Sequence, residues 1–202
     1  MSAALEQLRR HPAMWRRQAP PVGALPTGFP LLDGVLPDGG WPMGALTEIL
    51  ISREGAGELR LVMPALAALS ARGRWLAWMG PPYVPYAPAL MARGIVLSRI
   101  LWVCSGNSAQ QLWSAEQALR SGVCGAVLAW PTRVHQRRLR RLQLAAESGA
   151  AWALLFRATE RCDDGSPASL RLRVTPAARG LAVEVLKCQG KPGARVEIAL
   201  DE

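Results

Sequence analysis

Residues Ser52 to Leu59, with the sequence SREGAGEL, have residue types and spacing that could form a phosphate-binding loop. Working loops of this kind read GxxxxGK[ST]: backbone amides surround the phosphates, the lysine neutralises them and the hydroxyl binds Mg²⁺. Here Gly57 matches the second glycine and Gly55 lies within the loop, but Ser52 replaces the first glycine. Glu58 and Leu59 stand where the lysine and the hydroxyl are required. The pattern therefore predicts a degenerate phosphate loop between a strand and a helix.

The charge of Glu58 decides what this loop can bind. Two unit charges about 4 Å apart interact by roughly 4 kcal/mol at an effective dielectric constant of about 20. Replacing the attraction of a lysine with the repulsion of a carboxylate could therefore weaken phosphate binding by several powers of ten. We expect no tight binding of ATP and no cofactor at this loop. The alternative interpretation is that the glycines form only a turn.

Two further groups that nucleotide hydrolysis needs are also missing. A strand over residues 123–130 ends in Trp130, where an acidic residue would complete a metal site. The loop after the strand over 74–80 reads PPYVPYAP and offers no carboxylate to orient a water molecule. We therefore predict no catalytic residues, and a chain that is not an enzyme.

Arginines are concentrated just after this strand, in a segment that we expect to form a helix over residues 132–148. Leu139, Leu142 and Ala146 would face the sheet, and the arginines would face outwards. Such a group suits an anion or an acidic partner surface; the alternative is a solvated helix face. We expect any DNA binding to be weak, salt-sensitive and non-specific, because no aromatic side chain is interleaved for stacking on bases. The group consists of Arg133, Arg137, Arg138, Arg140 and Arg141.

Composition restricts the class of protein. The 202 residues are 50% hydrophobic with a net charge of +9, which suits a globular domain with a polyanionic or acidic partner. The four cysteines form no CxxC pair and the two histidines lie apart, so we predict no metal site. Neither a secretory signal nor an apolar run long enough to span a membrane is present, and we expect a cytoplasmic protein with reduced cysteines.

Strands and helices must alternate to position these groups, and this alternation predicts an α/β fold with a mostly parallel sheet flanked by helices. The expected strands are 47–51, 74–80, 99–105, 123–130 and 151–158, and the expected helices are 59–70, 90–94, a helix capped by Asn107, and 132–148. The tail, with strands over 169–174, 181–188 and 194–200, predicts antiparallel hairpins at an edge of the sheet, which could pair with a partner strand.

The chain divides into an N-terminal helix and linker over residues 1–26 and a core domain over 27–202. Six tryptophans, at positions 75, 78, 102, 113, 130 and 152, lie in or beside expected core elements, which indicates core packing. The expected partner-docking residues are Leu5, Leu8, Trp15 and Trp41. The alternative for the first three is a helix that frays or docks on its own domain.

The segment before the loop, residues 27–50, resembles the RecA family, whose pattern is TG-x-x-x-LD-x-x-L-x-x-GG-x-PMG-x-x-x-EI. The matching residues are Thr27, Gly28, Leu32, Asp33, Leu36, Gly39, Gly40, Pro42, Met43, Gly44, Glu48 and Ile49. The resemblance implies a degenerate RecA-like core. The segment after Trp130 is too short for the first DNA-binding loop of RecA, and residues 159–170, in place of the second, are acidic rather than glycine-rich and basic.

This combination of a RecA-like segment, lost phosphate-binding residues and a chain of this length resembles the ImuA family of bacteria. The resemblance implies a non-catalytic accessory role in error-prone translesion synthesis during the SOS response, in the cytoplasm and at the nucleoid after DNA damage. Its partners would be an ImuB-like homologue of Y-family polymerases, RecA and a second DnaE-type polymerase. The alternatives are a SulA-like inhibitor of cell division that acts on FtsZ, and a nucleotide- or DNA-binding RecA-like protein.

Overall fold

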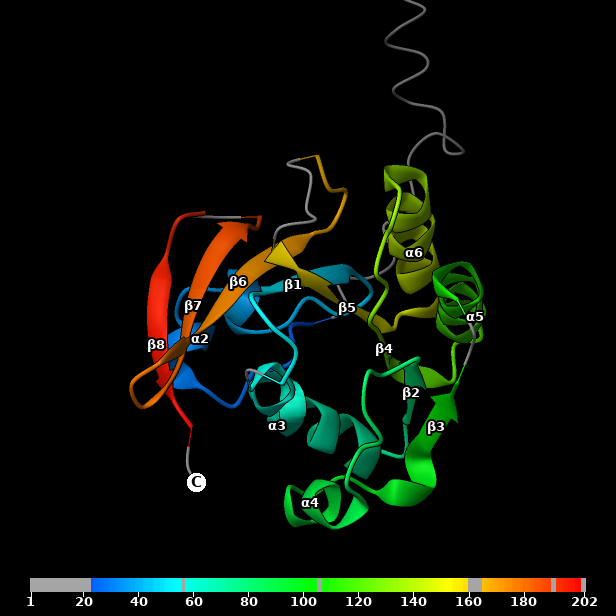
Figure 1. Cartoon of the computed structure of the whole chain (residues 1–202), viewed down its shortest axis with the longest axis horizontal. Helices are drawn as coiled ribbons and strands as arrows, with labels where there is room; N and C mark the ends of the chain where they lie inside the picture. The colour runs from blue at the N-terminus through cyan, green and yellow to red at the C-terminus, as the bar shows by residue number, and fades with distance from the viewer. Residues whose placement is uncertain (1–22, 56, 105–106, 160–164, 190–191, 201–202) are drawn as a thin grey trace, which may run out of the picture.

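One mixed sheet of eight strands forms the centre of the molecule, with helices on both faces (Figure 1). The structure is a computed structural model, and it describes residues 23–55, 57–104, 107–159, 165–189 and 192–200. The strands are ordered β3-β2-β4-β5-β1-β6-β7-β8. They comprise β1 (Leu46–Ile51), β2 (Trp75–Met79), β3 (Ile100–Val103), β4 (Cys124–Ala129), β5 (Trp152–Ala158), β6 (Leu170–Ala177), β7 (Gly180–Lys187) and β8 (Arg195–Ala199).

The sheet is parallel from β3 to β6 and antiparallel from β6 to β8. Strand β1 is central, because it pairs with β5 on one side and with β6 on the other. The prediction of a mostly parallel α/β sheet with antiparallel strands at one edge is therefore confirmed. Strand β6 begins the hairpin region, yet it joins β1 in parallel, which makes the C-terminal strands a continuation of the main sheet.

The larger hydrophobic core lies on the face covered by α2 (Pro30–Asp33), α3 (Glu58–Ala71) and α4 (Ala87–Ala92). Helix α3 buries Leu61, Ala65 and Leu69, whose spacing places them on one side of the helix. A second core lies on the opposite face, under α5 (Ser108–Arg120) and α6 (Gln136–Gly149). Two short 3-10 helices, η1 (Pro37–Gly39) and η2 (Leu97–Arg99), complete the fold.

The ends of α5 and α6 test two sequence-based expectations. Asn107 caps α5 as predicted, because its side chain accepts a hydrogen bond of 3.0 Å from the amide of Gln110. Helix α6 begins at Gln136 rather than at residue 132, so the predicted start was wrong. Pro131 lies just before the segment, and the backbone remains non-helical up to the extended residue His135.

The 27–50 segment is built into the larger core rather than lying over it. The amide of Thr27 donates to the Asp33 carboxylate over 2.9 Å, which closes the turn that leads into α2. Gly28 has a φ of +86°, and a Cβ at this position would lie 2.6 Å from the Cβ of Pro64 on α3. Only glycine meets both requirements, so this residue sets how closely the segment packs on α3.

Trp41 is part of this core, and the expectation that it docks a partner is wrong. Its backbone exchanges two hydrogen bonds with Leu25, and its fully buried ring lies 5.0 Å from the ring of Trp152, centroid to centroid. The opposite correction applies to three tryptophans expected in the core. Trp75, Trp102 and Trp113 are exposed, whereas Trp78, Trp130 and Trp152 are buried as predicted. The exposed members lie at the edge strand β3, on its neighbour β2 and on α5, where the sheet offers little cover.

Replacement of Trp41 by alanine is expected to lower the free energy of unfolding by about 3 to 5 kcal/mol, because it empties a fully buried site. Urea denaturation followed by circular dichroism measures the change. Trp113→Ala is the matched control, since this ring is exposed and its loss should cost about 0.5 kcal/mol. Equal effects of the two substitutions would contradict the core role of Trp41.

Candidate functional site

The loop between β1 and α3 joins the carboxyl end of a central strand to the N-terminus of a helix, as a phosphate-binding loop does. It turns through Gly55 and Gly57, whose φ angles of 75° and 99° lie in the left-handed region. Helix α3 starts directly afterwards, with the amide of Arg60 donating to the carbonyl of Gly57 over 2.9 Å. The N-terminus of a helix at the carboxyl end of a central strand is the place where an anion would be held.

In this chain the carboxylate of Glu58 takes that position. Its Oε1 accepts a hydrogen bond of 3.0 Å from the amide of Gly55, and the side chain is only 3% exposed. A negative charge in the first turn also interacts favourably with the helix dipole. One amide of the loop, that of Gly55, is therefore bound by a side chain of the same loop and helix. Ser52 is exposed, and Leu59, which has no hydroxyl, packs against the core.

Aromatic rings fill the space where the missing acidic residue would lie. Trp130 follows β4, and its ring stacks on Phe156 of β5 with centroids 4.9 Å apart and planes 16° apart. Trp78 of β2 lies 5.9 Å from Trp130 on the other side. These three rings make the carboxyl ends of neighbouring parallel strands an apolar, packed region.

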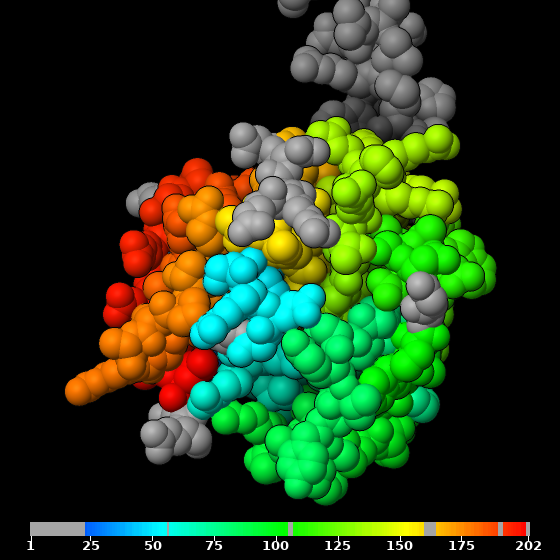
Figure 2. Space-filling view, viewed as in Figure 1, coloured from blue at the N-terminus to red at the C-terminus, as the bar shows by residue number. Residues whose placement is uncertain are grey.

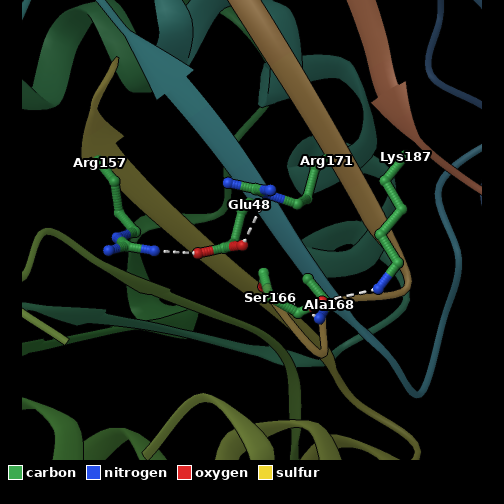
Figure 3. Close-up of polar contacts among 6 residues, drawn as sticks. All are labelled: Glu48, Arg157, Ser166, Ala168, Arg171 and Lys187. Carbon is green, nitrogen blue, oxygen red and sulfur yellow. Dashed lines mark hydrogen bonds and ion pairs between the residues drawn. The ribbon is translucent and has the colours of Figure 1, made fainter. Parts of the chain in front are cut away.

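A charged cluster lies at the centre of the sheet, and Figure 3 shows its geometry. Glu48 of β1 is fully buried between Arg157 of β5 and Arg171 of β6. Its Oε1 accepts a 2.5 Å hydrogen bond from Nη1 of Arg157, and its Oε2 forms a 3.1 Å ion pair with Nε of Arg171. Because the three strands are adjacent, the cluster joins the parallel part of the sheet to its C-terminal part.

The chain leading into β6 is held beside this cluster (Figure 3). Lys187 donates to the carbonyl of Ser166 over 2.7 Å, and the hydroxyl of Ser166 accepts from the amide of Ala168 over 3.1 Å. These contacts fix the approach to β6 after the acidic segment, whose residues 160–164 lie outside the described part of the chain.

The arginine group is only partly brought together. Arg137 and Arg140 are exposed on α6 and Arg138 is half-buried, while Leu139, Leu142 and Ala146 are buried as predicted. Arg133 precedes the helix, so its expected helical position was wrong.

Arg141 has a structural partner. It forms a 2.9 Å ion pair with Glu116 of α5, a buried carboxylate that Arg120 also contacts at 3.2 Å. Its charge therefore neutralises a buried carboxylate, although the arginine side chain is itself 45% exposed.

The remaining expectations concern the N-terminal segment, the cysteines, a metal site and a membrane span. Leu5, Leu8 and Trp15 lie outside the described residues. Cys124 is buried, and burial raises the pKa of its thiol, but Cys104 is exposed. Among the described residues, no His, Cys, Asp and Glu side chains gather in a group that could hold a metal ion. No helix in the described ranges is long and apolar enough to cross a membrane.

The arginines that contact Glu48 were missed from the sequence. Arg157 ends the run WALLFRA, and Arg171 follows a leucine in LRLRV. An arginine within an otherwise apolar strand could have signalled a buried ion pair, since arginines are rarely buried without a partner. The sequence did not indicate which carboxylate would pair with these two arginines.

Replacement of Glu58 by lysine, which restores the charge of a working loop, is expected to lower the free energy of unfolding by about 1 to 3 kcal/mol. The reason is that lysine cannot accept the hydrogen bond from Gly55 and would be buried there. Titration with a fluorescent ATP analogue is expected to show no saturation for wild type or variant. Glu58→Gln is the control, because it keeps an acceptor oxygen. A stable lysine variant that binds the analogue would refute this interpretation of the loop.

Replacement of Glu48 by glutamine is expected to cost roughly 3 to 5 kcal/mol of unfolding free energy, because two arginines lose a shared buried carboxylate. The control is Glu184→Gln on β7, which removes the carboxylate of the half-exposed ion pair with Arg173 and should cost about 1 kcal/mol or less. Chemical denaturation of both variants compares them. Similar losses would mean that burial does not set the strength of the Glu48 cluster.

Comparison with known proteins places this arrangement in a family. The family model described as "Cell division inhibitor SulA" matches residues 44–153, which is 110 of the 202 residues. The protein ImuA of Caulobacter vibrioides is 28% identical over 192 residues, covering 88% of this chain and 78% of that protein. The cell division inhibitor SulA of Yersinia enterocolitica is 26% identical over 131 residues, covering 64% of this chain and 78% of that protein.

Among solved structures, SulA from Pseudomonas aeruginosa is similar, with 29% sequence identity and a TM-score of 0.47. That match covers 55% of this chain and 97% of that chain. Since the family model matches more than half of the residues, the chain belongs to the SulA family and is an ImuA/SulA-like protein.

Proposed function

We propose that the chain is a non-catalytic, RecA-like accessory protein of an ImuA–ImuB complex for error-prone translesion synthesis in the SOS response to DNA damage. The observation that carries this proposal is the extent of the match to ImuA. This match covers 88% of the chain. The residues that it leaves unmatched are fewer than those before residue 44, and also fewer than those after residue 153. The match therefore extends into both flanks, which the SulA family model does not include.

The described residues of both flanks belong to the folded domain, which supports this choice. The N-terminal flank supplies Leu32 and Trp41 to the larger core, and the C-terminal flank supplies β6 to β8 to the sheet. A RecA-like core is supported by the matched 27–50 segment and by a loop of phosphate-binding form after the central strand β1.

A non-catalytic role is supported by the way in which the loop region is filled. Glu58 satisfies the loop amide, and Trp130 and Phe156 pack where a metal-binding carboxylate would be needed. Such a fold is retained for its surfaces. The proposed partners are an ImuB-like Y-family homologue, RecA and a second DnaE-type polymerase, and the proposed place of action is the cytoplasm and, after DNA damage, the nucleoid.

A second candidate is inhibition of cell division through FtsZ. The observation in its favour is the SulA family model, which matches the central part of the sheet and its helices over residues 44–153. The two candidates differ in their target, so one set of measurements separates them.

The full chain, affinity-tagged and co-expressed with the ImuB-like protein of the same organism, is expected to retain that protein through purification and gel filtration. FtsZ polymerisation, followed by light scattering with GTP, is expected to be unchanged by an equimolar amount of the chain. No co-purification would refute the accessory role. Suppressed FtsZ assembly would establish the second candidate in its place. A variant with Leu5, Leu8 and Trp15 replaced by alanine tests whether the N-terminal segment contributes to the complex.

A further inference from the structure

The exposed hydrophobic side chains are concentrated in one stretch of the chain. Twelve large hydrophobic residues are exposed in the described part of the chain, and eight of them lie between residues 75 and 102. We call these eight the β3-edge patch. It consists of Trp75, Tyr83, Val84, Tyr86, Met91, Val96, Leu101 and Trp102. Apolar patches of this kind mark sites of interaction with other proteins.

The stretch of chain that carries these residues ends in an edge strand of the sheet. Within the described chain, β3 pairs with β2 and has no strand on its other side (Figure 1). The loop after β2 and helix α4 supply the patch residues Tyr83, Val84 and Met91. In Figure 2 the segment from β2 to β3, coloured teal to green, forms a continuous part of the surface at one end of the molecule.

The two edges of the sheet differ in how they are protected. On β8, the exposed side chains include Arg195 and Glu197, charges that discourage pairing with another strand. On β3, Leu101 is 44% exposed and Trp102 is 36% exposed, and the strand contains no charged residue. The sequence indicated the C-terminal edge as an open one. The structure instead presents β3 as the edge without protecting charges.

The pairing of β3 with β2 shows which of its backbone groups face the open edge. The carbonyl of Val103 accepts from the amide of Gly80 at the end of β2, so Val103 points its peptide groups towards β2. Successive residues of a strand point their N–H and C=O groups to opposite sides. Trp102 therefore points its N–H and C=O away from β2, towards the open edge.

The charge around the patch selects the partner. From Leu59 to Ala115 the chain contains no acidic residue and five arginines, including Arg93 beside α4 and Arg99 at the start of β3. Arg99 lies over the ring of Trp75, 5.6 Å from its centroid. An acidic segment would complement this rim. The chain's own N-terminal segment would not, because residues 1–18 contain four arginines and a single glutamate.

We propose that the β3 edge binds an extended, apolar segment of a partner protein that is flanked by acidic residues, and that this segment adds a strand to the sheet. Backbone hydrogen bonds at Trp102 would supply affinity, and the patch and its arginines would supply selectivity. The identity of the partner protein rests on the proposed accessory role. The binding surface does not, because it is inferred from the position of β3 at the edge of the sheet.

The test uses the full chain and a fluorescein-labelled short peptide of alternating valine and threonine with glutamates at both ends. Fluorescence anisotropy is expected to show saturable binding, at least about tenfold tighter than that of the same peptide with lysines at its ends. Trp102→Pro removes the outward N–H and leaves pairing with β2 in place, because proline is accepted at the open side of an edge strand. It is expected to weaken binding at least about tenfold relative to Trp102→Val, which loses the ring but keeps the amide.

A charge reversal far from the strand backbone gives a second test that does not risk the fold. Arg93→Glu is expected to weaken the glutamate peptide and strengthen the lysine peptide, each by several-fold, whereas Arg179→Glu at the β6–β7 turn is expected to change neither. Absence of saturable binding by the glutamate peptide would overturn the proposal. So would equal binding to the proline and valine variants, or tighter binding of a peptide comprising residues 1–18.

The two proposals can fail separately. Peptide binding without co-purification of the ImuB-like protein would leave the β3 site standing and remove the accessory role. Co-purification that Trp102→Pro does not weaken, together with absence of peptide binding, would keep the accessory role and place its docking surface elsewhere.

Discussion

The fold depends on one buried ion cluster, in which Glu48 lies between Arg157 and Arg171. A carboxylate removed from water is costly unless it is paired, so the three strands that carry these residues must remain adjacent and in register. A slip of β6 by one residue would turn Arg171 to the opposite face of the sheet and leave Glu48 with one arginine. The cluster therefore specifies how the C-terminal strands join the parallel sheet, in addition to any stability that it supplies.

The loop after β1 combines the glycines and helix start typical of a phosphate-binding loop with side chains that pack against it. The loop after β1 retains two left-handed glycines and the helix N-terminus that follows them. Several groups near this backbone serve packing: Glu58 binds the amide of Gly55, and the rings of Trp130 and Phe156 stack at the strand ends. Selection for surfaces rather than for turnover would preserve such a framework, because the loop still connects the central strand to the helix that covers the main core.

The elements could be predicted from the sequence because their signals are local. Alternation of apolar runs gave every strand, and Asn107 identified the start of α5. Contacts between distant segments could not be predicted in the same way. Trp41 lies in a stretch rich in glycine and proline that resembles a surface loop, but a backbone bridge to Leu25 draws its ring into the core. The arginine partners of Glu48 depend on strand order, which alternation alone does not reveal.

The internal carboxylate at the loop also limits how the molecule can be controlled. Nucleotide-driven proteins release their partners when hydrolysis changes the occupant of such a loop, and this converts chemical energy into a timed step. Under the proposed non-catalytic role, a loop whose Gly55 amide is bound by Glu58 of the same chain has no nucleotide to exchange. Under the proposed role, the lifetime and amount of its complexes would follow from affinity and cellular concentration, so synthesis and proteolysis become the means of switching them on and off.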